Sequence, residues 1–161
     1  MSAMDCYVFT TDPTGAAYAE LVEFCCSVAS KMILVLRDPQ KDPGARITEK
    51  LARLSEFRVE TVRAGEWPGT ILLADEALVY WHRVAPGLQQ VLQELATHLF
   101  EWVHPAAPED LCFFRADGRV ILVTTSHEGD SYLMLTEPEF QALTERAPHV
   151  VAILRLEGPA S

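Results

Sequence analysis

The chain is 161 residues long, the size of one ordinary domain, and 49% of its residues are hydrophobic, which is enough to form a full core. It carries 23 acidic and 13 basic residues, a net charge of −10, and no stretch gathers the lysines and arginines that neutralise a phosphate backbone, so nucleic acid is excluded as a partner. No apolar run approaches the ~20 residues that cross a bilayer, and the N-terminus lacks the basic flank and apolar stretch of a signal peptide, so we predict one cytoplasmic domain over residues 1–161 that spans no membrane.

The N-terminal part of the chain has the pattern of a β-α-β unit. An apolar strand is predicted at residues 6–9, and a helix that is apolar on most sides follows at 16–30. A second apolar strand at 33–36 completes the unit, whose crossover is right-handed if the two strands are parallel. Asp42 and Pro43 then predict the start of a shorter helix.

The middle of the chain is expected to contain three strands and one long helix. Alternating residues at 57–62 predict a half-exposed strand, and two more strands are predicted at 71–73 and 77–84. Apolar residues at helical spacing over 88–103 predict the long helix, which His104-Pro105 ends. The segment at 105–108 is the one candidate for a junction between subdomains.

The C-terminal part gives the most definite local prediction. Apolar runs at 111–114 and 120–123 flank Asp117-Gly118, a dipeptide that favours an antiparallel hairpin. Thr136 and Glu139 stand in the capping-box relation and predict a helix that begins near Glu137.

A last strand is predicted at 150–156. Together these elements predict an α+β fold with a mixed, mostly antiparallel sheet, an N-terminal β-α-β unit and about four helices.

The four cysteines, Cys6, Cys25, Cys26 and Cys112, lack Cys-x-x-Cys spacing, and each lies in an apolar run. We therefore predict reduced thiols in the core and neither a disulfide nor a cysteine metal site.

His127, Glu128 and Asp130 lie in a short polar segment between the predicted hairpin and the run at 132–135. An imidazole and two carboxylates within four residues are enough for a general base with an orienting acid, or for part of a metal site. Adjacent residues point apart in extended structure, however, and the chain has no His-Glu-x-x-His, Gly-x-Ser-x-Gly or Walker motif for them to join. The alternative is that Asp130 and Ser126 cap the turn while His127 is solvated or donates to a backbone carbonyl, so we assign no catalytic residue, metal or cofactor.

Two aromatic positions are candidate contacts for a partner. Trp67 lies in a turn, where it can anchor an interface or fill the edge of the core. Trp81 and Arg83 share one face of a predicted strand and offer a stacking and charge-assisted contact if that face is outward. The alternative is that Trp81 packs beneath the long helix.

Residues 111–143, with Ser126-His127-Glu128-Gly129-Asp130 at their centre, resemble a group of small uncharacterised bacterial proteins that end in a similar hairpin, His-Glu loop and short helix. The resemblance covers about a quarter of the chain. It implies a bacterial cytoplasmic origin and a role for the loop, with no catalytic assignment.

These features predict a non-enzymatic acidic binding or regulatory protein, with immunity-like masking of a basic protein partner as its specific form. The candidate partner-binding residues are Trp67, Trp81, Arg83, His127, Glu128 and Asp130. The alternative is a small hydrolase or metal-dependent enzyme that uses the loop of His127, Glu128 and Asp130. No residue pattern indicates an oligomeric state.

Overall fold

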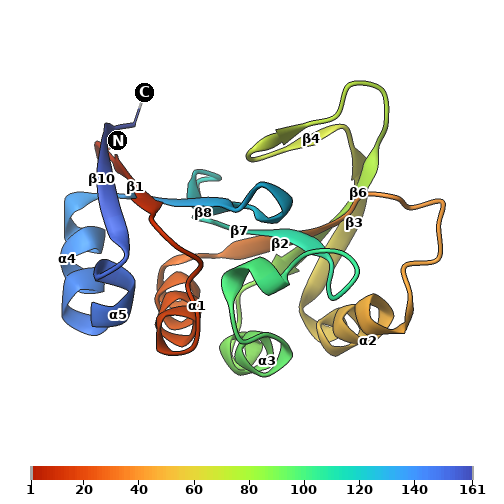
Figure 1. Ribbon diagram of the computed structural model, residues 1–161, viewed down its shortest axis with the longest axis horizontal. Helices are drawn as coiled ribbons and strands as arrows, with labels where there is room; N and C mark the ends of the chain where they lie inside the picture. Colours follow the sequence, from red (N-terminus) through yellow and green to blue (C-terminus); the bar gives the residue numbers. More distant parts are fainter. Residues whose placement is uncertain (1, 161) are drawn as a thin grey trace.

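Eight strands form one sheet in the computed structural model, which describes residues 2–160 (Figure 1). In order across the sheet they are β10 (Leu154–Pro159), β1 (Asp5–Phe9), β9 (Asp130–Leu135), β8 (Val120–Thr125), β7 (Glu109–Phe114), β2 (Lys31–Leu36), β6 (Ala77–Arg83) and β3 (Arg58–Ala64). Two short strands, β4 (Glu66–Trp67) and β5 (Thr70–Ile71), pair separately as a hairpin.

The helices lie together on one face of the sheet, and the β4–β5 hairpin lies over the other (Figure 1). The α-helices are α1 (Ala16–Val28), α2 (Ala45–Arg53), α3 (Leu88–Leu95), α4 (Glu137–Arg146) and α5 (Pro148–Val151). Three short 3-10 helices are η1 (Ser55–Phe57), η2 (Leu99–Glu101) and η3 (Ser126–Glu128). No helix within residues 2–160 combines the length and the hydrophobicity needed to cross a membrane.

The α+β fold and the mostly antiparallel sheet are confirmed. Over the described residues every pair of neighbouring strands in the large sheet is antiparallel. β1 and β2 run in the same direction, but β9, β8 and β7 lie between them, so the expected β-α-β unit contributes no parallel pair. Strands from both sides of the segment at 105–108 therefore pair within one sheet.

The larger core lies between the sheet and the helices. Helix α1 is buried on several sides, as its sequence predicted, through Tyr18, Leu21 and Cys25 among others. Two polar side chains of this core are hydrogen-bonded to each other and to the backbone: Trp102 Nε1 donates to Tyr18 Oη at 3.0 Å, and Tyr18 donates in turn to the Leu92 carbonyl at 2.8 Å. These contacts satisfy groups whose burial would otherwise oppose folding.

All four cysteines are free thiols, but Cys6 and Cys26 are only partly buried, so the predicted core position holds for Cys25 and Cys112. Cys25 and Cys112 are fully buried, and burial raises the pKa of the Cys112 thiol to about 12. Both side chains act as small apolar core residues.

A second, smaller core lies on the hairpin side of the sheet. It contains Ile33, Val35, Trp67, Ala77, Val79, Cys112, Phe114 and Val123. The hairpin thus covers the part of this face formed by β8, β7, β2 and β6.

The predicted long helix at 88–103 is wrong in its second half. Helix α3 ends at Leu95, and Ala96 and His98 are extended. The reason is a tertiary contact, because Asp12 accepts a hydrogen bond from Phe100 N at 3.1 Å and lies 2.6 Å from His98 Nδ1. These bonds to the β1–α1 loop replace the helical turn that the apolar spacing predicted.

The predicted last strand also begins too early. Residues 148–151 form α5, and strand β10 begins only at Leu154. Glu20 of α1 accepts hydrogen bonds from His149 N at 3.0 Å and Val150 N at 3.2 Å, and Pro148 occupies the first turn. These features stabilise a helix start in a stretch whose apolar residues favour a strand.

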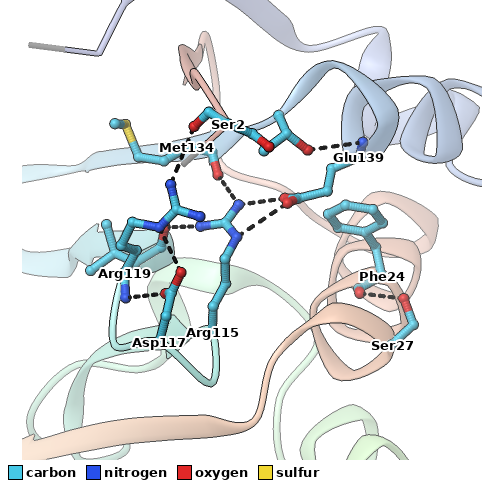
Figure 2. A network of polar contacts seen from close by, with 10 residues as sticks. Ser2, Phe24, Ser27, Arg115, Asp117, Arg119, Met134 and Glu139 are labelled. Carbon is cyan, nitrogen blue, oxygen red and sulfur yellow. Dashed lines mark hydrogen bonds and ion pairs between the residues drawn. The ribbon is translucent and has the colours of Figure 1, made fainter.

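The predicted C-terminal hairpin and capped helix are present, and Arg115 joins them (Figure 2). Arg115 Nη2 donates to the Met134 carbonyl of β9 at 2.7 Å, and its Nε donates to Glu139 of α4 at 3.1 Å. Thr136 Oγ1 accepts from Glu139 N at 3.4 Å, which is the predicted cap. The register of β8 and β9 is therefore fixed at the end opposite η3.

Gly69, at the tip of the β4–β5 hairpin, occupies a position that excludes a side chain. Its φ is 86°, and a Cβ there would lie 2.6 Å from Thr125 Oγ1. Gly118 has a similar φ of 88° but no atom within 4 Å of the corresponding Cβ. Substitution of Gly118 therefore tests backbone strain alone, whereas substitution of Gly69 tests backbone strain together with a steric clash.

We expect Gly118→Ala to cost about 1 kcal/mol through its left-handed backbone alone. Gly69→Ala should cost about 1 kcal/mol more, because the hairpin must move away from β8. Urea unfolding of both variants measures the difference. Equal losses would contradict close packing of the hairpin tip on Thr125.

Candidate functional site

The structure places the predicted polar loop at the rim of the sheet, where two of its three candidate side chains, His127 and Glu128, lie close together. His127 and Glu128 lie in η3, and Asp130 begins β9. The side chains of His127 and Glu128 are 40% and 59% exposed, and His127 Nε2 lies 3.7 Å from Glu128 Oε1. The flanking Ser126 and Ser131 are buried. Only His127 turns towards other functional groups.

Arg37, which directly follows β2, contacts groups from three distant parts of the chain. Its Nε lies 2.7 Å from Glu109 Oε2, and its Nη2 lies 3.1 Å from Asp110 Oδ2. The same Nη2 lies 3.0 Å from His127 Nδ1. The guanidinium also lies over the Trp67 ring, 5.3 Å from its centroid, which is a cation–π distance. We call this set the Arg37 cluster: Arg37, Trp67, Glu109, Asp110 and His127.

Asp110 is the most constrained member of the Arg37 cluster. Its side chain is fully buried, and its backbone is left-handed with φ 57°, a conformation that aspartate tolerates better than most residues. Oδ2 accepts hydrogen bonds from Trp67 Nε1 at 2.9 Å and from Arg37 Nη2. Oδ1 accepts from the Ser126 amide at 3.0 Å. One carboxylate therefore joins the start of β7 to the ends of β2 and β8 and to the hairpin.

The contact with Arg37 determines the tautomer of His127. A guanidinium has only donors, so His127 Nδ1 must accept the hydrogen bond and the ring proton must lie on Nε2. The lone pair that a general base would use is occupied in this arrangement.

The donor atoms of Glu109, Asp110 and His127 lie within 4.8 Å of one another, a spacing that one metal ion can bridge. Arg37 contacts all three of these side chains. The positive charge that two adjacent carboxylates require is therefore supplied by the protein itself.

Trp67 is buried, with 7% of its surface exposed. The predicted alternative, that Trp67 fills the edge of the core, describes its position. Trp81 is partly buried, and its ring packs 4.9 Å from that of Phe114. Both tryptophans line a cavity of about 220 Å³ beneath the hairpin. Arg83 is exposed and donates to the Glu56 carbonyl at 2.8 Å.

Beyond the hairpin, the same face of the sheet carries half-buried apolar side chains. Leu133 and Leu135 of β9 belong to the helix-side core, so the alternating residues of this strand face the hairpin side. On β1, the burial of Tyr7 and Phe9 in the helix-side core gives Val8 the same orientation as Tyr132, its partner in the register. Figure 1 shows no helix over this part of the sheet. We call this surface the open face: Cys6, Val8, Asp130, Tyr132 and Met134.

Asp130 lies where the open face meets the hairpin. It pairs with Thr125 in the register of β8 and β9, and Thr125 lies directly under Gly69 at the hairpin tip. Its carboxylate is exposed, as is that of Glu128 in the adjoining η3. The apolar strip formed by Val8 and Tyr132 therefore has acidic groups at one end.

The Arg37 cluster was only partly predictable. The loop at 126–130 drew attention to His127, but Arg37, Glu109 and Asp110 were missed. Two signals were available in the sequence: the adjacent acidic residues Glu109 and Asp110 precede one apolar strand, and Arg37 directly follows another apolar strand. Both patterns are common where strands meet solvent. Comparison of the chain with protein-family models, with curated proteins and with solved structures finds no match to any of them.

Proposed function

We propose that this chain is a non-enzymatic binding protein that recognises a basic protein segment on the open face of its sheet. The observation that carries the proposal is the exposed carboxylate of Asp130 at the end of a half-buried apolar strip that includes Val8 and Tyr132. Such a combination suits a segment with an apolar centre and a basic flank. The net charge of −10 attracts that segment at long range.

The Arg37 cluster supports binding rather than catalysis. Both oxygens of Asp110 are occupied by donors from the protein, and His127 Nδ1 accepts from Arg37. Proton transfer by His127 Nδ1, or coordination of a metal ion by these side chains, requires Arg37 to withdraw from its present contacts. The cluster instead holds the hairpin and η3 in fixed positions beside the open face. An immunity-like protein that masks a basic partner fits this rigid acidic surface.

The proposal is tested by capture from native lysate at ~0.05 M and ~0.5 M salt, conditions that differ in electrostatic screening. The immobilised baits are the wild type, Asp130→Lys and Tyr132→Ala. Glu145→Lys is the matched control, because it makes the same charge change at an exposed position on α4, on the helix side.

We expect a basic protein to be retained at low salt by the wild type and by Glu145→Lys, and to be lost from the two open-face variants. Retention of the same proteins by all four baits would overturn the proposal, as would binding that does not weaken at high salt. Circular dichroism of each bait checks that the fold is retained.

A further inference from the structure

We infer that strand β10 is a self-pairing edge through which two copies of this chain form an antiparallel, two-fold symmetric dimer. This inference is independent of the proposed function. β10 is one end of the eight-stranded sheet, so over the described residues one of its edges has no neighbouring strand. The edge strand exposes Leu156, whose surface is 59% accessible.

The backbone of β10 presents the correct groups at this edge. The Thr10 amide donates to the Ile153 carbonyl at 2.9 Å, so the backbone groups of Ile153 point towards β1. The pairing of β10 with β1 is regular from Leu154 to Leu156, and its register shifts only after Leu156, at Glu157. Backbone polar groups alternate along the regular part of an antiparallel strand, and Leu156 is therefore oriented away from β1. Its N–H and C=O lie on the open side, where two copies of Leu156 can exchange both hydrogen bonds.

The side chains around Leu156 are complementary to themselves. A two-fold axis at Leu156 places Arg155 of each copy opposite Glu157 of the other, and this gives two opposite-charge pairs by symmetry. Within one chain Arg155 Nη2 already lies 3.2 Å from Glu157 Oε2, so both side chains point to the same face of the sheet. They are 67% and 56% exposed, and both are therefore available to a second copy. The two leucines meet on the other face.

The opposite edge of the sheet has a similar sequence, because self-pairing of β3 about Val59 would place Arg58 opposite Glu60. Arg58 is half-buried, however, donates to the Leu51 carbonyl at 3.0 Å and lies 4.8 Å from the centroid of the Tyr80 ring. Self-pairing of β3 about Glu60 opposes two like charges. A register centred on Thr61 places Arg63 opposite Val59, and a register centred on Val62 places Arg63 opposite Thr61. The exposure of both charged side chains therefore distinguishes β10 from β3.

Sedimentation velocity of the purified chain, over concentrations up to roughly 1 mM, tests the inference. We expect a concentration-dependent dimer. Its dissociation constant should rise about tenfold in Arg155→Glu and in Glu157→Arg, because each single reversal creates two pairs of like charges across the dimer axis. The double variant Arg155→Glu with Glu157→Arg should restore the dimer. Arg53→Glu with Glu94→Arg, which reverses an exposed ion pair between α2 and α3, is the matched control and should leave association unchanged.

Amide hydrogen exchange gives a second measurement that does not depend on the variants. The Leu156 amide should become protected as the wild-type concentration rises. A monomer at every concentration overturns the inference, as does a dimer that is indifferent to the single reversals or is not restored by the double reversal.

Discussion

Replacement of Asp110 by asparagine is expected to lower the free energy of unfolding by about 3 kcal/mol, because it removes a buried charge that three donors share. An amide oxygen can replace only one of the two carboxylate oxygens. If it faces Arg37 and Trp67, the amide nitrogen meets the Ser126 amide, which is also a donor. If it is turned round, two donors lose their acceptor. Asparagine tolerates the left-handed backbone, so the loss reports hydrogen bonding and charge rather than strain.

Urea unfolding, followed by tryptophan fluorescence, measures this loss. Because Trp67 Nε1 donates to Asp110, its hydrogen exchange should also become faster in the variant. Asp38→Asn is the control, since the Asp38 carboxylate is 72% exposed. Its ion pair with Lys41 Nζ, at 3.8 Å, is also exposed to solvent. It should change stability by less than about 0.5 kcal/mol. Equal stability of the two variants would show that the cluster does not hold the hairpin.

Acidification from neutral pH is expected to destabilise the protein through His82, a fully buried residue of β6. Burial, with a further contribution from the Arg58 guanidinium, lowers the pKa of His82 to about 4 from its usual 6.5. Between these two values the unfolded chain binds a proton that the folded chain does not, so stability falls as the pH falls through this window. The total loss is about 3 kcal/mol, of which about 2 kcal/mol is reached by pH ~5.

The measurement is the free energy of unfolding in urea at several pH values across that window. His82→Leu removes the buried titrating group, and its stability should be nearly flat from neutral pH to pH ~5. His104→Leu, at an exposed histidine, should keep the slope of the wild type. A wild type with no slope over the same range would contradict a neutral, buried His82.

The elements that could be predicted are those whose signals lie within a few residues of each other. Asp117 and Gly118 form the turn between β7 and β8, and Thr136 caps α4, as their local chemistry indicated. Helix α1 was recognisable because apolar residues cover most of its circumference. In each case no other secondary structure for the same residues had an equally strong local signal.

The parts that could not be predicted depend on contacts between distant residues. Arg37 is 73 positions from Asp110 and 90 from His127, and no spacing rule connects them. The interruption of the predicted long helix depends on Asp12, which is 88 positions from Phe100. Asp130 was grouped with His127 and Glu128 because the three are neighbours in sequence, whereas Asp130 begins β9 and lies on the open face.

The insertion of β7, β8 and β9 between β1 and β2 has a consequence for how the chain folds during synthesis. Until residues 109–135 have left the ribosome, β1 has neither of its two neighbours and β2 lacks one of them. The nascent chain therefore exposes apolar strands that can pair only after most of the protein has been made. Such a high contact order implies slow, largely post-translational folding, during which these strands are open to aggregation.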